Sequence, residues 1–194
     1  NKQFTADDIF TIYTPTGPDY DIGSSANLFS VDGKDLVGIG VKSGIYYALD
    51  RDSGAIVWMQ TISGGSSLGG IISASAYANG MIFVASNVGM GGPTHTVGLN
   101  AKDGSIAWMN ESPAVTYGGV AHANGVVYVG TNGGSILALD GAKGTMLWVD
   151  KTLNAQPIGG SPSISHGKLL VPWGYTWTLR EGAAGTGGLT VYGL

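Results

Sequence analysis

Three eleven-residue stretches of similar sequence recur along this chain of 194 residues. Each begins with a small residue and Leu, continues with Asp or Asn, three turn-forming residues and Gly, and closes after three more residues with Trp; they are residues 48–58, 98–108 and 138–148. The tryptophans Trp58, Trp108 and Trp148 are therefore 50 and then 40 positions apart. One four-stranded blade of a β-propeller takes about 40–50 residues. The spacing predicts an all-β architecture built from repeated blades.

The residues between these motifs also recur. Each interval holds a two-residue turn signal between two runs rich in β-branched and aromatic residues: Asn79-Gly80, Asn124-Gly125 and His166-Gly167. Asn-Gly is the strongest local signal for a β-hairpin, because both positions tolerate a positive φ. Together with the motif strands, these hairpins predict four-stranded antiparallel meanders. We expect residues 1–194 to form a partial propeller of about four blades, near residues 21–61, 70–110, 115–150 and 158–194.

The fourth expected blade is incomplete. Residues 189–194 supply its third strand, and the sequence then ends. In closed propellers the last blade commonly takes one strand from the other end of the chain. Residues 4–13 could provide that strand only in a four-bladed ring. An open row would leave unpaired strand edges and exposed faces between blades, which soluble proteins rarely tolerate. We therefore expect a partner that closes the ring.

The repeated Trp and the repeated Asp or Asn have a structural interpretation first. An indole between neighbouring blades buries a large area, and its N–H can donate to a backbone carbonyl. Asp50, Asn100 and Asp140 are well placed to cap the following turn through their own side chains. We expect these motif residues to be scaffold without a chemical role.

Composition excludes several classes of protein. The chain has 34 Gly and only 11% charged residues, which fits many short strands joined by tight turns. Its net charge is −4 and its Lys and Arg do not cluster, so we expect no nucleic-acid partner. No apolar run approaches the roughly 20 residues that span a bilayer. The absence of Cys excludes disulfides and thiolate metal sites within these residues.

Two segments carry a resemblance to a known family. They are residues 17–29 (GPDYDIGSSANLF) and residues 40–50 (GVKSGIYYALD). Together with the Trp motif, they resemble the pyrroloquinoline quinone (PQQ) dehydrogenases, in particular the polyvinyl-alcohol-dehydrogenase-like branch. The resemblance implies an eight-bladed ring of which this chain is the C-terminal half. It also implies PQQ and a calcium or lanthanide ion as cofactors, a small alcohol as substrate, and a periplasmic or extracellular location.

The resemblance assigns roles to three residues. Asp19 matches the aspartate that takes the proton of the alcohol while hydride passes to the quinone, and a carboxylate can do such general-base work. Asp21 matches a position that adds a carboxylate to the metal in lanthanide-using relatives. Lys42 matches the basic residue that contacts the quinone oxygens. If residues 19–21 form a strand, the two carboxylates point to one face, where they could share a cation.

Other interpretations of the same residues stay open. Asp19-Tyr20-Asp21 could be a polar turn, and residues 42–44 could be a hairpin tip. Relatives usually have a Trp in the segment that here runs from Gly69 to Ala74, and other ligands of the family belong to an N-terminal half. The alternative function is a propeller without catalysis that binds proteins or associates with itself. The partner that closes the ring is then either a missing N-terminal half or a second copy of the chain.

Overall fold

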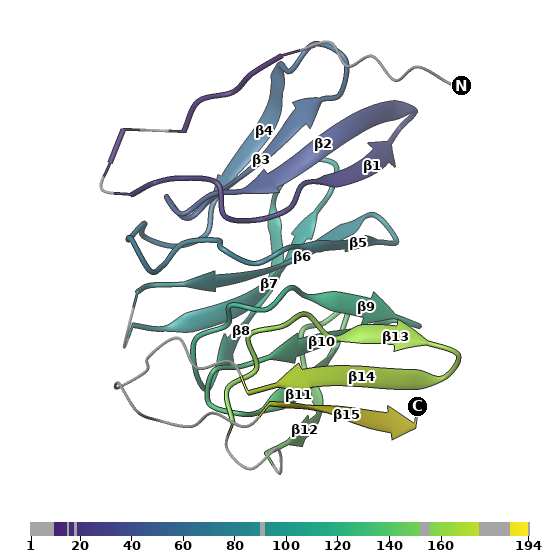
Figure 1. Cartoon of the computed structure of the whole chain (residues 1–194). Coiled ribbons are helices and arrows are strands. Elements are labelled where there is room, and N and C mark those ends of the chain that lie inside the picture. The colour runs from purple at the N-terminus through teal and green to yellow at the C-terminus, as the bar shows by residue number, and fades with distance from the viewer. Residues whose placement is uncertain are drawn as a thin grey trace, which may run out of the picture.

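The computed structural model describes residues 10–14, 16–17, 19–89, 92–151, 156–174 and 187–193. These residues form four antiparallel sheets, in each of which the strands follow one another in chain order. Figure 1 shows the sheets arranged in a row, from the purple first sheet to the green and yellow last one. The expectation of an all-β chain made of consecutive meanders is confirmed.

The strands of the first three sheets have the following bounds. The first sheet contains β1 (Asn27–Val31), β2 (Lys34–Gly40), β3 (Ile45–Asp50) and β4 (Ile56–Thr61); the second contains β5 (Ala76–Ala78), β6 (Met81–Asn87), β7 (Thr94–Asn100) and β8 (Ile106–Ser112); the third contains β9 (Ala121–Ala123), β10 (Val126–Gly130), β11 (Ile136–Asp140) and β12 (Met146–Asp150). The fourth sheet has three strands among the described residues, β13 (Ser163–Ser165), β14 (Lys168–Trp173) and β15 (Gly188–Gly193).

The hairpins between the first two strands of the later sheets form where the turn signals predict them. Asn79, Asn124 and His166 have φ values of 52°, 50° and 48°, and the glycine after each of them also has a positive φ. Two successive residues in this region give the turn whose twist matches the flanking strands. His166 therefore takes a conformation that Asn adopts more readily, because the hairpin geometry requires it.

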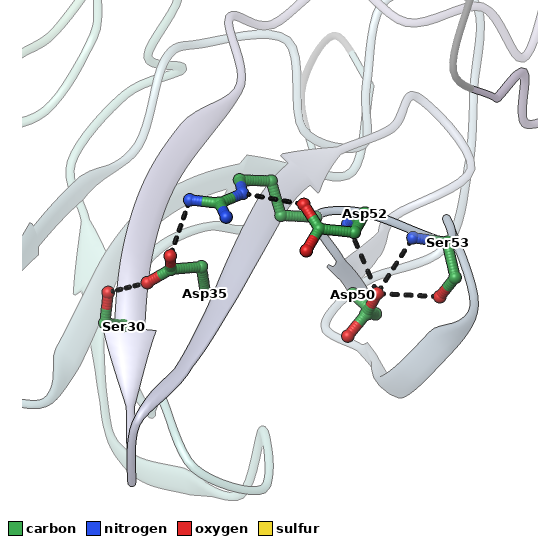
Figure 2. Close-up of polar contacts among 6 residues, drawn as sticks. Ser30, Asp35, Asp50, Asp52 and Ser53 are labelled. Atoms are coloured by element: carbon green, nitrogen blue, oxygen red, sulfur yellow. Dashed lines mark hydrogen bonds and ion pairs between the residues drawn. The ribbon is translucent and has the colours of Figure 1, made fainter.

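The Asp at the start of a motif turn accepts several hydrogen bonds. Asp50 Oδ1 accepts from the backbone N–H of Asp52 at 3.2 Å, from that of Ser53 at 2.9 Å and from the Ser53 hydroxyl at 2.7 Å (Figure 2). Asp140 Oδ1 accepts from two backbone N–H groups in the same way.

The middle motif differs. Asn100 Nδ2 donates to the Ser105 hydroxyl at 2.6 Å, and Asp103 is the residue whose carboxylate accepts from the backbone N–H and the hydroxyl of Ser105. Asn100 thus bonds to its turn through its side chain as a donor, whereas Asp50 and Asp140 bond as acceptors, and in the middle motif Asp103 is the acceptor.

Indoles join consecutive sheets. Trp58 Nε1 donates to the carbonyl of Ala101 in the second sheet at 3.0 Å, and Trp108 Nε1 donates to the carbonyl of Gly141 in the third at 2.9 Å. Both side chains are buried. Each ring lies over a motif glycine of the next sheet, Gly104 or Gly144, so closely that a Cβ there would overlap it. The absence of a side chain at these glycines thus makes room for the indole.

Apolar side chains fill the spaces between the sheets. One cluster, with Phe29, Tyr46 and Trp58, joins the first sheet to the second, and another, with Phe83 and Trp108, joins the second to the third. A third cluster joins the third sheet to the fourth and includes Tyr128 and Ile136. Residues 10–14 lie against the first sheet rather than beside β15. Residues 4–9, the remainder of the proposed additional strand, lie outside the described part of the chain.

Candidate functional site

The three residues singled out by the sequence lie together. Lys42 follows β2 in a tight turn before β3, and its backbone N–H donates to the carbonyl of Asp21 at 3.2 Å. Its Nζ lies 2.9 Å from Asp19 Oδ2 and 2.8 Å from Asp21 Oδ1. The Lys42 side chain is only 13% exposed, whereas the Asp19 and Asp21 side chains are 54% and 63% exposed. The ammonium group of a largely buried lysine side chain therefore bridges two carboxylates that face solvent.

A turn at Asp19, and not a strand, brings the two carboxylates to one side. Residues 19–23 belong to no strand, and Asp19 has a φ of 57°, in the left-handed region that non-glycine residues rarely adopt. The strand considered as one possibility for residues 19–21 is thus not formed. The polar-turn interpretation of this segment describes its backbone correctly, and the pairing of both carboxylates with Lys42 holds that backbone in place.

Tyr20, between the two aspartates, fixes the segment against the Lys42 turn. A Cβ at Gly65 would lie 2.7 Å from the Tyr20 ring and 2.8 Å from the Cα of Ser43, and a Cβ at Gly17 would overlap the same ring. The ring therefore occupies the space left by two glycines. No motif in the sequence marks Gly65, whereas Tyr20 is marked only by its position between two candidate residues.

The electrostatics of the cluster favour a charged lysine. Hydrogen bonds from Lys42 to Asp21 and then to Asp19 raise the pKa of the ammonium group above its usual value, against a smaller opposing effect of burial. Lys42 therefore carries its positive charge at every pH near neutrality, and it offsets the repulsion between the two carboxylates.

Lys42, but neither of the two aspartates, lines a cavity of about 320 Å³ between loops that belong to all four sheets. Its lining comes from the inner loops of each sheet, namely Gly23, Lys42, Ser67, Leu68, Ile72, Tyr117 and Gly159. A larger cavity of about 450 Å³ lies near the outer hairpins of the second and third sheets, but its lining contains neither Lys42 nor the two aspartates. We therefore place the candidate site at the inner cavity, because Lys42 lines it and does not line the larger cavity.

Two lining residues, Tyr117 and Gly159, were not expected from the sequence. Each lies next to or within a glycine pair, Gly118-Gly119 or Gly159-Gly160, and Gly69-Gly70 stands at a similar place before the second sheet. A Cβ at Gly118 would overlap the carbonyl oxygen of Gly160, so the inner loops of neighbouring sheets approach each other closely there. The repetition of these pairs was the available signal for the inner ends of the sheets.

The described residues supply only part of a metal site. They contain no group of three or more His, Cys, Asp or Glu side chains able to hold an ion. Asp19 and Asp21 offer carboxylate oxygens, which hard cations such as Ca²⁺ prefer, but Ca²⁺ takes 6–8 oxygen ligands. The donor chemistry therefore fits a hard cation, and further ligands would have to come from outside these residues.

Comparisons with known proteins agree on the architecture. Residues 41–176 match the family model described as outer membrane protein assembly factor BamB. A polyvinylalcohol dehydrogenase from Pseudomonas sp. is 30% identical over 94% of this chain and 34% of the relative, and one from Sphingopyxis sp. (strain 113P3) is 29% identical over 86% and 31%. The chain spans about a third of the length of these curated relatives.

A solved structure shows the same fold. A europium-containing methanol dehydrogenase superposes with a TM-score of 0.65 at 18% identity, over 80% of this chain and 40% of its own. The expectation of a partial β-propeller with antiparallel blades is confirmed, and each sheet described above is one blade. At this identity the likeness concerns the fold alone.

Proposed function

The chain belongs to a family of PQQ-dependent dehydrogenase-like β-propellers, and on this premise we propose that it forms part of a PQQ-dependent alcohol dehydrogenase. The observation that carries the proposal is the Lys42 ammonium group held between the Asp19 and Asp21 carboxylates beside the cavity at the inner ends of all four blades. Because the chain spans about a third of its curated relatives, it would contribute one side of the active site.

In this proposal Asp19 acts as the general base. PQQ, when bound, supplies a two-electron acceptor for the hydride that leaves the carbon of the alcohol. The hydroxyl proton of the alcohol passes to the Asp19 carboxylate, so that the substrate loses one hydride and one proton and becomes a carbonyl compound. Asp19 suits this role because its side chain is half exposed toward solvent. Lys42 holds the Asp19 carboxylate in position through the contact at 2.9 Å.

Lys42 would also contact the quinone. Its ammonium group lies at the edge of the cavity and can donate three hydrogen bonds, of which two go to the aspartates. A fixed positive charge there would stabilise negative charge that develops on an oxygen of the cofactor. Since the stem of the side chain is largely buried, the ammonium group is held in a narrow range of positions.

Asp21 is proposed as a ligand of a calcium or lanthanide ion. Its carboxylate is the more exposed of the two and could supply one or two oxygen ligands. The same carboxylate pairs with Lys42, so a cation and the ammonium group compete for it. Binding of the ion would therefore require Lys42 to release Asp21, or to share it through different oxygen atoms.

A non-catalytic propeller that binds proteins is the second candidate. The match to the BamB family model favours it, because that model is named for an assembly factor. The segment from Gly69 to Ala74, which lacks the Trp expected of dehydrogenases, favours it as well. We propose a periplasmic or extracellular location for either function. In the described part of the chain, no helix is long and apolar enough to cross a membrane.

The proposal is tested by supplying the purified protein with PQQ and either CaCl₂ or LaCl₃. Retained quinone is measured by absorbance after gel filtration, and turnover by alcohol-dependent reduction of a dye.

The Asp19→Asn variant should retain PQQ and lose at least about a hundredfold in turnover. Asp35→Asn is the control, because Asp35 is also half exposed and paired with a cation, Arg51, away from the cavity. Unchanged turnover in Asp19→Asn would reject the base. Because the chain would contribute only one side of the site, the test is made on the protein together with the partner or further chain that completes its ring, and failure of that wild-type assembly to retain PQQ would reject the dehydrogenase in favour of the protein-binding propeller.

A further inference from the structure

The larger cavity, of about 450 Å³, lies between the second and third blades. It is bounded by the first hairpin of each of these blades and by the motif turn of the third. Both blades have a neighbour on either side in the row, so neither end of the sequence takes part in this cavity. No described residue lines both this cavity and the inner one.

The pairing register relates this contact between blades to the contact between the first and second blades. The third residue of each motif lies opposite a residue of the second strand: Asp50 opposite Leu36, Asn100 opposite Met81, and Asp140 opposite Val126. In this register Ala78 holds the position of Phe29, and His122 holds that of Tyr77. The two contacts can therefore be compared residue by residue.

The first contact is occupied by side chains of the protein itself. The Phe29 and Tyr77 rings stack with their centroids 5.1 Å apart, and the Tyr77 hydroxyl donates to the carbonyl of Ser30 at 3.1 Å. Lys102, in the motif turn of the second blade, reaches the first hairpin of the first blade, where its Nζ lies 2.7 Å from Asp32 Oδ2. A lysine thus bridges the two blades at this place.

The second contact lacks two of these groups. Ala78 stands in the place of Phe29, and Ala142 stands at the motif position of Lys102. Both alanines line the cavity. The cavity is therefore found where this contact has neither the ring nor the ammonium group of the first contact.

One wall of the cavity is fixed by stacking and carries no charge. The His122 ring lies over the Phe83 ring, with centroids 5.2 Å apart and an angle of 10° between the planes, and Phe83 also stacks on Trp108. Burial lowers the pKa of His122, so its ring is neutral at pH 7 and one ring nitrogen can accept a hydrogen bond. Met81 and Leu147 add apolar surface to the same cavity.

The charged group in the lining is a carboxylate. Asp140 Oδ1 accepts from the backbone N–H groups of Ala142 and Lys143 at 2.8 and 2.9 Å, whereas Oδ2 has no hydrogen bond or ion pair with the described residues. Asn79 and Asn124 also line the cavity, and their amide oxygens can accept hydrogen bonds. In the described part of the chain, no Lys or Arg lines this cavity.

We propose that this cavity binds the alkylammonium group of a primary amine. The three N–H donors of that group match the Asp140 carboxylate, the amide oxygens and the neutral imidazole, and its alkyl stem packs against Met81 and Leu147. At the first contact the protein already holds such a group, Lys102, beside the carboxylate of Asp32. The site uses neither the quinone nor the inner cavity, so it and the proposed function can fail separately.

The experiment is an NMR titration of the purified protein, without PQQ, with hexylammonium chloride. We expect saturable shifts of the His122 ring signals with a Kd of about a millimolar or tighter. Pentyl methyl ether has the same number of heavy atoms without the charge, and it should bind at least about fivefold more weakly. Nα-acetyl-lysinamide identifies the source of the group: binding equal to or tighter than that of hexylammonium assigns the site to a lysine side chain of a protein, and weaker binding assigns it to a free amine.

Two variants give the second contact what another blade already has. Asp140→Asn introduces the residue of the second motif, Asn100, and should weaken binding by about fivefold or more, because it removes the charge. Ala78→Phe introduces the ring of Phe29 and should abolish binding, because it fills the cavity. Asp52→Asn is the control: Asp52 is 82% exposed in the motif turn of the first blade, away from the cavity, and its variant should bind like the wild type.

Urea denaturation of each variant shows whether it is folded. If Ala78→Phe fails to fold, Asp140→Asn decides the test, because Asn at this motif position is compatible with the second blade. A wild type without saturable shifts at His122 would overturn the proposal. Equal binding of the amine and the ether, or unchanged affinity in a folded Asp140→Asn variant, would overturn it as well.

Discussion

Single side chains carry both the candidate chemistry and much of the stability of the first two blades. The Lys42 ammonium group neutralises two carboxylates that would otherwise repel each other at short range. Tyr46, in contrast, contributes to stability. Its side chain is fully buried between the first and second blades, and its hydroxyl lies 3.0 Å from that of Ser75. The two residues lead to different predictions, one on ion binding and one on the pH dependence of folding.

Replacing Lys42 by Met should increase the affinity of the protein for a hard cation. The variant leaves Asp19 and Asp21 without their cationic partner, so an added ion no longer competes for the carboxylates. Removing a positive charge so close to the carboxylates is worth about 1 kcal/mol, which corresponds to an increase in affinity of about fivefold. Titration with Tb³⁺, followed by its luminescence, measures the affinity. Lys34→Met, on the exposed start of β2, is the control. Equal or weaker binding by Lys42→Met would show that the ion does not use these carboxylates.

Tyr46 should make the protein sensitive to alkaline pH. Burial raises the pKa of its hydroxyl to about 12 from 10.0. Above pH 10 the unfolded chain loses this proton while the folded chain keeps it, so the free energy of unfolding falls until the pH reaches the folded pKa. The full effect is about 2–3 kcal/mol. Urea denaturation at pH 7 and pH 11 measures it. Tyr46→Phe should start less stable at pH 7 and lose less between the two pH values; an equal loss in both proteins would contradict the assignment to Tyr46.

At the scale of the elements, the motif turn is the unit that repeats. In each of the first three blades, the pairing of the last two strands shifts register within the motif, at Ala48/Leu49, Gly98/Leu99 and Ala138/Leu139. The bulge, the turn and the glycine under the aromatic ring recur together. Each motif thus shapes the end of its own blade and the contact with the preceding one.

Gly104→Ala should be far more destabilising than Gly80→Ala. Both glycines belong to the second blade and have nearly the same φ, +75° and +76°, so both substitutions carry the same backbone strain of about 1 kcal/mol. A Cβ at Gly80 meets nothing within 4 Å, whereas one at Gly104 overlaps the Trp58 ring. Displacing that buried indole should add about 1–3 kcal/mol. Urea denaturation measures both variants, and equal losses would mean that the ring moves aside without cost.

The elements could be predicted from the sequence because their signals are local. Asn79-Gly80 and Asn124-Gly125 specify hairpins by their own backbone preferences.

The geometry of the site could not be predicted in the same way. The left-handed conformation of Asp19 depends on contacts with Lys42, and the cavity joins Tyr117 and Gly159 from distant blades. In the middle motif Ser105 bonds to both Asn100 and Asp103, and the repeat alone did not indicate that Asp103 would be the acceptor. Long-range packing determines these features, and it leaves no periodic signal in a single sequence.

For the whole molecule, stability should decrease from the middle of the row toward the open face. The second and third blades are covered on both sides, and strands such as β7 and β11 are almost entirely buried. The fourth blade is covered on one side, and alternate residues of β15 are exposed. Amide hydrogens in β15 should therefore exchange much faster than those in β7, because the last blade can open without disturbing the others.

The same experiment separates an isolated row from a completed ring. If a partner or further chain covers the fourth blade, exchange in β15 should be slower in that assembly than in this chain alone, and exchange in β7 should be unchanged, because only the open face gains a neighbour. Hydrogen exchange read by mass spectrometry measures both strands in one sample. Fast exchange in β7, at the centre of the row, would contradict the argument, because both of its faces are covered by other blades.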